Sequence, residues 1–128
     1  MTTLTRADWE QRAQALVIEG RAFIHGAYTD AASKATFDCI SPVDGRSLGQ
    51  VASCDLADAN VAVADARATF ESGIWSRLSP VKRKQAMIRF ADLMDANAEE
   101  LALLETLDMG KPIGDALSVD VPGASRAI

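Results

Sequence analysis

The segment from Ala98 to Pro112, with the sequence AEELALLETLDMGKP, limits the possible fold more than any other part of this chain. Its leucines recur at helical spacing on one side, and its glutamates fall mostly on the other. Asn97 and Glu100 have the spacing of a capping box, which satisfies amide groups at a helix start. Gly110 can close a helix in the left-handed conformation, and Pro112 cannot continue one. The sequence therefore predicts an amphipathic helix that begins and ends within this segment.

Before this segment, the sequence predicts a leading helix, short strands and further helices. We expect a leading helix within residues 1–20 that ends at Gly20, short strands and a hairpin within residues 21–53, and helices over residues 55–128. The tetrapeptide from Pro42 to Gly45 predicts the hairpin turn, because proline fixes one torsion and glycine supplies a positive one. The chain is thus predicted to be mainly α-helical, with a small antiparallel β-hairpin region.

Helical periodicity also indicates which sides of two helices are buried. Asp55 can cap the first of them, and Ser79 followed by Pro80 is typical of the start of the second. The apolar sides consist of Leu56, Ala59, Val63, Ala66 and Phe70 in the first helix, and of Met87, Phe90, Ala91 and Met94 in the second. Because a two-stranded sheet covers little surface, we expect these sides to pack against structure that this segment lacks.

Composition excludes several classes of protein. The chain has 128 residues, of which 48% are hydrophobic and 24% charged, as in one ordinary soluble domain. Its net charge of −5 argues against a nucleic-acid surface, and the basic run from Lys82 to Lys84 is more typical of an exposed helix side. No apolar run is long enough to span a membrane, and the polar first residues are unlike a secretory signal. We therefore expect a cytoplasmic protein with no nucleic-acid or membrane partner.

Three residue types with reactive side chains need separate interpretation. Cys39 and Cys54 are too far apart for a CxxC pair, so we expect two reduced thiols and assign neither as a nucleophile. His25, the only histidine, precedes Gly26 and is interpreted as a turn residue rather than a ligand or base. Asp108 lies near a predicted helix C-terminus, where the helix dipole disfavours an acid. It is either a solvated acid or a residue with a positively charged partner.

Four blocks in a fixed order resemble the amino-terminal region of NAD(P)-dependent aldehyde dehydrogenases. They are FIHGAY, TFDCISPVDGRSLGQVASC, the alanine-rich run from DLADAN to RFADLM, and ETLDMGKPI. The resemblance extends from about Arg21 to Ile128. Within the family, the segments DWEQRAQAL, AEELALLETLDMGKPI and VPGASRAI are most similar to gamma-glutamyl-gamma-aminobutyraldehyde dehydrogenases of putrescine catabolism.

The resemblance implies an α/β fold of the Rossmann-like aldehyde dehydrogenase type, in a subunit that assembles into dimers or tetramers. Such enzymes oxidise an aldehyde to a carboxylic acid through a cysteine thiolate and a general-base glutamate, with hydride transfer to NAD or NADP. The family's nucleophile, base and cofactor-binding motifs are all expected beyond Ile128. No catalytic or cofactor-binding residue is therefore assigned here. The catalytic domain is expected to be absent, and this N-terminal segment is predicted to be inactive alone.

The resemblance does assign two candidate sites within the chain. Many family members bind Na+ or K+ through the carbonyl just before the x-Pro pair of the hairpin and through the aspartate of the Leu-Asp-x-Gly-Lys motif. These positions correspond to Ile40 and Asp108 here. A helix-end hydrogen bond is the alternative role for Asp108. The region from Val119 to Gly123 resembles the wall of the family's substrate entrance. There Asp120 is expected either to attract an amine-bearing aldehyde or to be an exposed helix-cap acid.

A non-enzymatic function is the alternative. The chain would then be a helical interaction module that presents its apolar sides to a partner protein. A stable, monodisperse chain would favour the module, and a reading frame for the catalytic region downstream would favour the enzyme. Either way, we expect the isolated chain to expose apolar surface.

Overall fold

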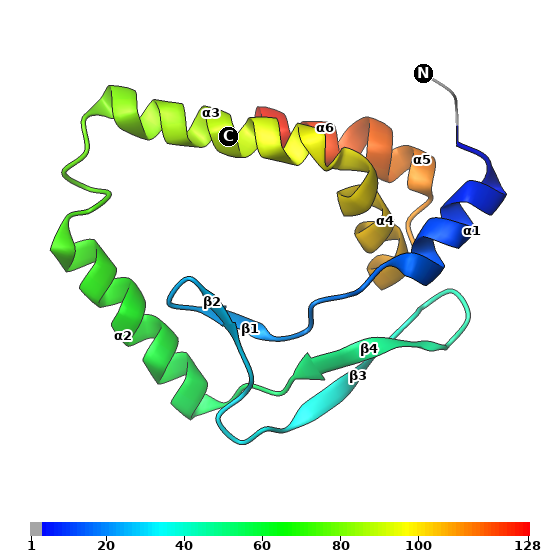
Figure 1. Cartoon of the computed structure of the whole chain (residues 1–128), viewed down its shortest axis with the longest axis horizontal. Helices are drawn as coiled ribbons and strands as arrows, with labels where there is room; N and C mark the ends of the chain where they lie inside the picture. The colour runs from blue at the N-terminus through cyan, green and yellow to red at the C-terminus, as the bar shows by residue number, and fades with distance from the viewer. Residues whose placement is uncertain (1–3) are drawn as a thin grey trace. The chain divides into compact units, whose positions relative to one another are not determined.

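The computed structural model describes residues 4–128, which form two compact units. The helical unit comprises residues 4–18, 40–48 and 90–128, and the hairpin unit comprises residues 19–39 and 49–89. The elements in chain order are α1 (Arg6–Ala15), β1 (Ala22–Ile24), β2 (Ala27–Thr29), β3 (Thr36–Ile40), β4 (Ser47–Ala52), α2 (Leu56–Ser72), α3 (Pro80–Ala96), α4 (Ala98–Met109), α5 (Ile113–Asp115), the π-helical turn η1 (Ala116–Asp120) and α6 (Val121–Arg126) (Figure 1). The prediction of a mainly helical chain with small antiparallel hairpins is confirmed.

The first hairpin, β1–β2, turns at His25 and Gly26 as predicted. Both residues have positive φ, at 56° and 74°, which is the backbone of a two-residue hairpin turn. The strands pair antiparallel, with Ile24 opposite Ala27 next to the turn. The role of His25 as a turn residue therefore follows from the backbone that the hairpin requires.

The second hairpin, β3–β4, also turns where the sequence predicts. The Gly45 amide donates to the Ser41 carbonyl at 3.0 Å, and the Ser41 amide donates to the Arg46 carbonyl at 2.9 Å. Gly45 has a φ of 73°, a conformation that glycine adopts without steric cost. The two hairpins form separate two-stranded sheets.

The start of α2 is held by two aspartates. Asp55 caps the helix as predicted, and its side chain accepts a hydrogen bond from the Ala57 amide at 2.7 Å. Asp58 is buried, with one oxygen accepting from the Asp55 amide at 3.0 Å and the other from the Ala32 amide at 2.8 Å. These backbone hydrogen bonds, that from Asp55 first, lower the pKa of Asp58. The loop after β2 is thereby fastened to α2.

In the helical unit, α4 lies between α1 and the stretch formed by α5, η1 and α6 (Figure 1). The buried centre consists of Ala102 from α4, Ala116 from η1 and Val121 from α6. On the α1 side, Arg12 pairs with Glu99 of α4, and its guanidinium lies 5.5 Å from the centre of the Trp9 ring. This unit therefore has a small core made mainly of alanine and valine.

Two predicted helix ends are wrong. Asn97 does stand at the N-cap position of α4, but its side chain makes no capping hydrogen bond and donates to the Leu93 carbonyl at 2.7 Å instead. The leading helix ends at Ala15, because Leu16 already has an extended backbone. The chain then runs to Gly20, whose carbonyl accepts the Ala52 amide at 2.8 Å. Pairing with β4 thus replaces the last predicted turn of helix.

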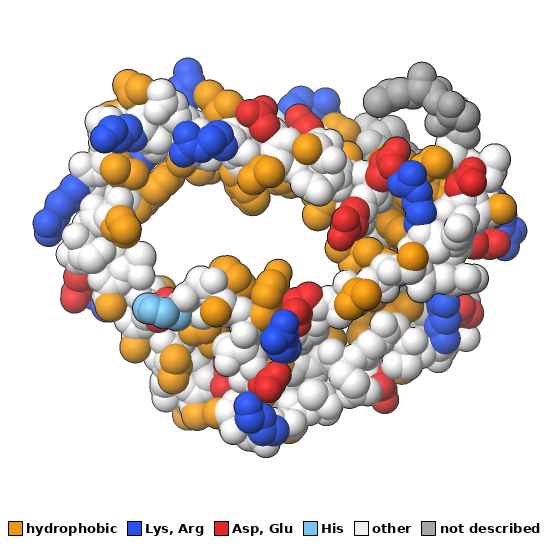
Figure 2. All heavy atoms as spheres, in the orientation of Figure 1, with side chains coloured by type: hydrophobic (Ala, Val, Ile, Leu, Met, Phe, Trp, Pro, Cys, Tyr) orange, Lys and Arg blue, Asp and Glu red, His pale blue; other side chains and the backbone are white. Residues whose placement is uncertain are grey.

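In this chain taken by itself, the apolar sides predicted for α2 and α3 are largely exposed, as expected if they pack against structure that this segment lacks. Leu56, Val63 and Phe70 are 65–75% exposed, and Phe90 of α3 is exposed as well. Figure 2 shows such hydrophobic side chains at the surface. A helix side is buried only where another element covers it, and none of the described residues covers these positions. Within residues 4–128, no helix combines the length and apolar composition that crossing a bilayer requires.

Candidate functional site

The predicted cation ligands lie on two segments that pack together in the helical unit. Gly110 ends α4 with a φ of 78°, and its amide donates to the Thr106 carbonyl at 3.0 Å. A Cβ atom on Gly110 would lie 3.2 Å from Pro42 Cγ and 3.7 Å from Val43 Cγ2. Glycine therefore permits both the positive φ and the close approach. The end of α4 consequently lies against the turn that follows Ile40.

Asp108 is exposed near this helix end, and the side chain of Ile40 is half exposed. The dipole of α4 makes its C-terminus favourable for a cation. Hard cations take about six or more oxygen ligands, however, whereas the Asp108 carboxylate and the Ile40 carbonyl supply at most three. Among the described residues, no group of three or more His, Cys, Asp or Glu could hold a metal ion. The cation site at Ile40 and Asp108 therefore stays a prediction.

Asp120, the predicted substrate-entrance residue, is paired with a lysine. Lys111 Nζ contacts Asp120 Oδ2 and lies 3.8 Å from Glu105 Oε1. The hydrogen bond to Asp120 is the main cause that raises the pKa of Lys111, followed by the charges of Asp120, Glu105 and Asp115. An amine-bearing aldehyde would have to compete with Lys111 for this carboxylate. The entrance role of Asp120 also stays a prediction.

Sequence reasoning missed Lys111. It treated the Gly-Lys-Pro segment as a helix terminator and did not assign a partner to the lysine. Lys111 and Asp120 are nine positions apart, which is not a spacing at which side chains meet on one helix. The available signal was local charge, because Glu105, Asp115 and Asp120 surround a single lysine.

The reactive side chains of the hairpin unit do not form a catalytic arrangement. Cys39 is partly buried in β3 and Cys54 is exposed before α2, and both are thiols as predicted. His25 Nδ1 contacts Asp65 Oδ1 on α2, and this hydrogen bond raises the pKa of His25. The histidine is thus paired with a carboxylate of α2.

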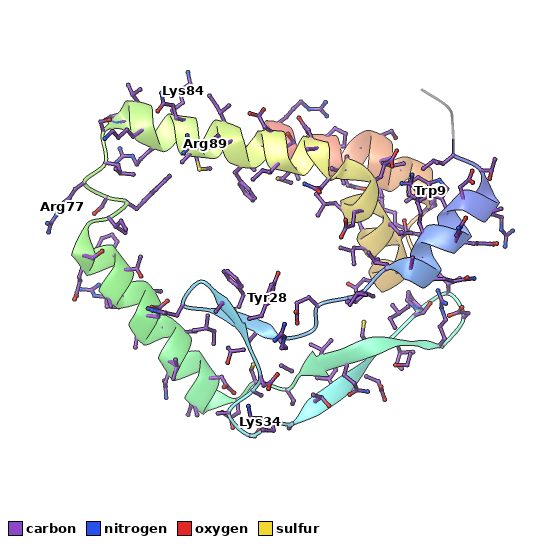
Figure 3. The ribbon with its side chains drawn as sticks, in the orientation of Figure 1. Trp9, Tyr28, Lys34, Arg77, Lys84 and Arg89 are labelled. Atoms are coloured by element: carbon purple, nitrogen blue, oxygen red, sulfur yellow. The ribbon has the colours of Figure 1, made fainter. Side chains whose placement is uncertain are left out.

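The basic residues around the start of α3 behave as an exposed helix side. Figure 3 shows Arg77 and Lys84 directed away from the ribbon. Arg83 donates to the Ser76 carbonyl at 3.1 Å, so part of its function is to hold the connection before the helix. This placement agrees with the sequence interpretation of the cluster.

Comparison with known proteins gives a consistent result along the chain. The model of the aldehyde dehydrogenase family matches residues 28–128. The chain is 51% identical over 122 residues to the NADP/NAD-dependent aldehyde dehydrogenase PuuC of Escherichia coli (strain K12). The matched region covers 95% of this chain and 25% of that protein.

Two solved structures extend the comparison. The indole-3-acetaldehyde dehydrogenase AldA of P. syringae, in complex with NAD+ and IAA, matches with a TM-score of 0.96 and 74% identity over 98% of this chain and 25% of that chain. The gamma-glutamyl-gamma-aminobutyraldehyde dehydrogenase of Burkholderia cenocepacia matches with a TM-score of 0.95 and 57% identity over 96% of this chain and 25% of that chain.

The chain thus spans about a quarter of the length of these relatives. The fold expected from the order of the sequence blocks is confirmed, and a gamma-glutamyl-gamma-aminobutyraldehyde dehydrogenase is among the similar proteins. From these matches, the chain belongs to the aldehyde dehydrogenase family, whose members are oxidoreductases.

Proposed function

We propose that this chain is the amino-terminal quarter of an NAD(P)-dependent aldehyde dehydrogenase subunit. The observation that carries the proposal is the match to PuuC over 95% of this chain but only 25% of that protein. In the complete subunit, defined here as this chain continued by the remaining part of the family domain, the chain would provide hairpins and helices that support the catalytic part. We propose that this subunit is cytoplasmic and forms a homodimer or homotetramer.

We propose an aminoaldehyde of polyamine breakdown as the substrate. The name of one relative supports this class, namely the gamma-glutamyl-gamma-aminobutyraldehyde dehydrogenase of Burkholderia cenocepacia. Indole-3-acetaldehyde is a second candidate, because the relative named for it has 74% identity over nearly the whole chain. The two substrates differ in charge and ring content, so their relative turnover distinguishes the candidates.

The isolated chain is proposed to be inactive. The thiol, base and oxyanion groups of the reaction supply most of the lowering of the barrier, and the described residues contain no equivalent set. When bound, NAD+ or NADP+ accepts the hydride. Residues of this chain would contribute by packing and by shaping the path of the aldehyde.

The test compares the complete subunit with residues 1–128 alone in reduction of NAD+ and of NADP+. We expect the complete subunit to oxidise the glutamylated aminobutyraldehyde, and the isolated chain to give only the rate without protein. Activity of the isolated chain that is lost in Cys39→Ser or Cys54→Ser would overturn the proposal. A complete subunit that oxidises no aldehyde would also overturn it and would favour the interaction module.

We also propose that Asp108 and the Ile40 carbonyl share Na+ or K+ in the complete subunit. The packing of Gly110 on Pro42 supports this, because it brings the two segments together. We expect added K+ to raise the melting temperature of the wild type but not of Asp108→Asn. Asp92→Asn, at an exposed position on α3, is the matched control and should retain the response to K+. An equal response in all three proteins would refute the cation site.

A further inference from the structure

The stretch from Ile113 to Arg126 is not a uniform helix. In η1, the Val121 amide donates to the Ala116 carbonyl five residues earlier, which is the hydrogen bond of a π turn. Pro122 explains why the helix widens here, because proline has no amide hydrogen and its ring clashes with the carbonyl four residues earlier. Ser118 Oγ donates to the Gly114 carbonyl at 2.7 Å, which also perturbs the regular pattern.

The π turn decides which side chains face α4. Ala116 and Val121 are both buried in the cluster with Ala102. In a regular α-helix, residues five positions apart point about 140° away from each other, so both could not face the same neighbour. Return to α-helical geometry would therefore turn the start of α6 away from α4. Val119, which is 59% exposed, would change its direction as well.

One ion pair connects the end of this turn to α4. Asp120 is the last residue of η1, and its Oδ2 atom is buried. Lys111 Nζ contacts this oxygen, and no other described residue donates a hydrogen bond to it. The same ammonium lies 3.8 Å from Glu105 Oε1 on α4. Lys111 thus bridges the helix before the turn and the last residue of the turn.

We propose that Lys111 is a positioning residue that holds η1 and the start of α6 in place through Asp120. The inference rests on the proposed function, in which the segment from Val119 to Gly123 forms part of the path of the aldehyde. Pro122 favours a break in the helix at this point, but it does not fix the direction in which the next helix leaves. The attachment of Asp120 to Lys111 supplies that direction.

The test uses the complete subunit with Lys111→Met, which keeps length but removes charge, and Lys111→Arg, which keeps the charge. Lys34→Met is the matched control, because Lys34 forms an exposed ion pair with Asp30 at 3.2 Å in the hairpin unit. We expect amide exchange of residues 113–126 to become about tenfold faster in Lys111→Met, as for loss of a hydrogen bond between charged groups. The arginine variant and the control should stay within about twofold of wild type.

Enzyme kinetics separates positioning from general loss of structure. We expect Lys111→Met to raise KM for the aldehyde several-fold with kcat nearly unchanged, since the residue does not touch the reacting atoms. A protein that is only less stable would show faster exchange throughout and a proportional loss of kcat. That outcome, or unchanged exchange over residues 113–126, would overturn the inference.

A second variant keeps the test decisive if Lys111→Met does not fold. Asp120→Asn preserves shape and removes the charge of the partner, so amide exchange over residues 113–126 should become faster by the same factor as in Lys111→Met. The exchanged pair, Lys111→Asp with Asp120→Lys, should restore the wild-type rate of amide exchange. Unchanged exchange in Asp120→Asn, together with exchange that the exchanged pair does not restore, would refute the pairing. If the complete subunit oxidises no aldehyde, the proposed function fails, while amide exchange still decides the role of Lys111.

Discussion

Gly20→Ala is the substitution whose consequence the structure determines most directly. A Cβ atom on Gly20 would lie 2.0 Å from the Gln50 carbonyl oxygen and 2.9 Å from its carbon, which are backbone atoms of β4. No side-chain rotation can relieve this overlap. The backbone around Gly20 and β4 would have to separate by about 1.4 Å or more to reach an ordinary contact distance.

That separation has a calculable cost. The hydrogen bond from the Ala52 amide to the Gly20 carbonyl, now 2.8 Å, would lengthen beyond the range of a hydrogen bond. Loss of the hydrogen bond and the strain of overpacking each cost about 1–3 kcal/mol. Alanine also lowers the entropy of the unfolded chain, which offsets about 0.4–1 kcal/mol. We therefore expect a local destabilisation of about 2 kcal/mol or more.

Hydrogen exchange of the Ala52 amide in the complete subunit measures this effect. A cost of about 2 kcal/mol corresponds to exchange about thirtyfold faster than in wild type. Gly114→Ala is the matched control, because a Cβ atom there meets nothing within 4 Å. In the control, nearby amides should exchange at the wild-type rate or up to about fivefold more slowly. If Gly20→Ala leaves exchange at Ala52 unchanged, the close packing of Gly20 on β4 is wrong.

Three further predictions concern burial and charge. The isolated chain should bind a dye for exposed apolar surface and should associate, and sharp two-state unfolding of a dye-free monomer would contradict this. Thr106→Val should stabilise α4 by about 1 kcal/mol, because Thr106 Oγ1 is buried and has no hydrogen-bond partner among the described residues. Exchange of α4 amides should slow in Thr106→Val but not in Thr69→Val at an exposed site of α2. Asp65 raises the pKa of His25 in the folded chain. The pair therefore stabilises the fold fully at a pH below the ordinary histidine pKa, and this stabilisation is lost as the pH rises through the raised pKa. NMR titration of His25 in the complete subunit should show the raised pKa, and Asp65→Asn should return it toward 6.5.

The positions of the elements were predictable where proline, glycine and capping residues mark their ends. The turn at Pro42 to Gly45, the cap at Asp55 and the closure of α4 at Gly110 are local features that depend on backbone torsions. The first helix ends at Ala15 for a different reason, since pairing of Gly20 with β4 is a contact between segments that are distant in sequence. Local propensity contains no information about such contacts.

The candidate site was predictable only in part for the same reason. The family resemblance identified Asp108 and Asp120 as candidates. The structure adds Lys111, which pairs with Asp120, so that this carboxylate is not freely available to a substrate amine. Lys111 reaches Asp120 only because the chain reverses between α4 and η1. The π turn itself has a sequence signal in Pro122, because a proline cannot continue the hydrogen-bond pattern of a regular helix.

The buried carboxylate of Asp58 has a consequence for the order in which the chain folds. Its two oxygens hold the amides of Asp55 and Ala32, and Ala32 is 26 residues earlier in sequence. During synthesis, the loop between β2 and β3 therefore remains without this anchor until Asp58 has left the ribosome. At about 5–20 residues per second, that interval is on the order of a few seconds. Until then only the contacts within and between the two hairpins order this loop, and arrival of the first turn of α2 fastens it.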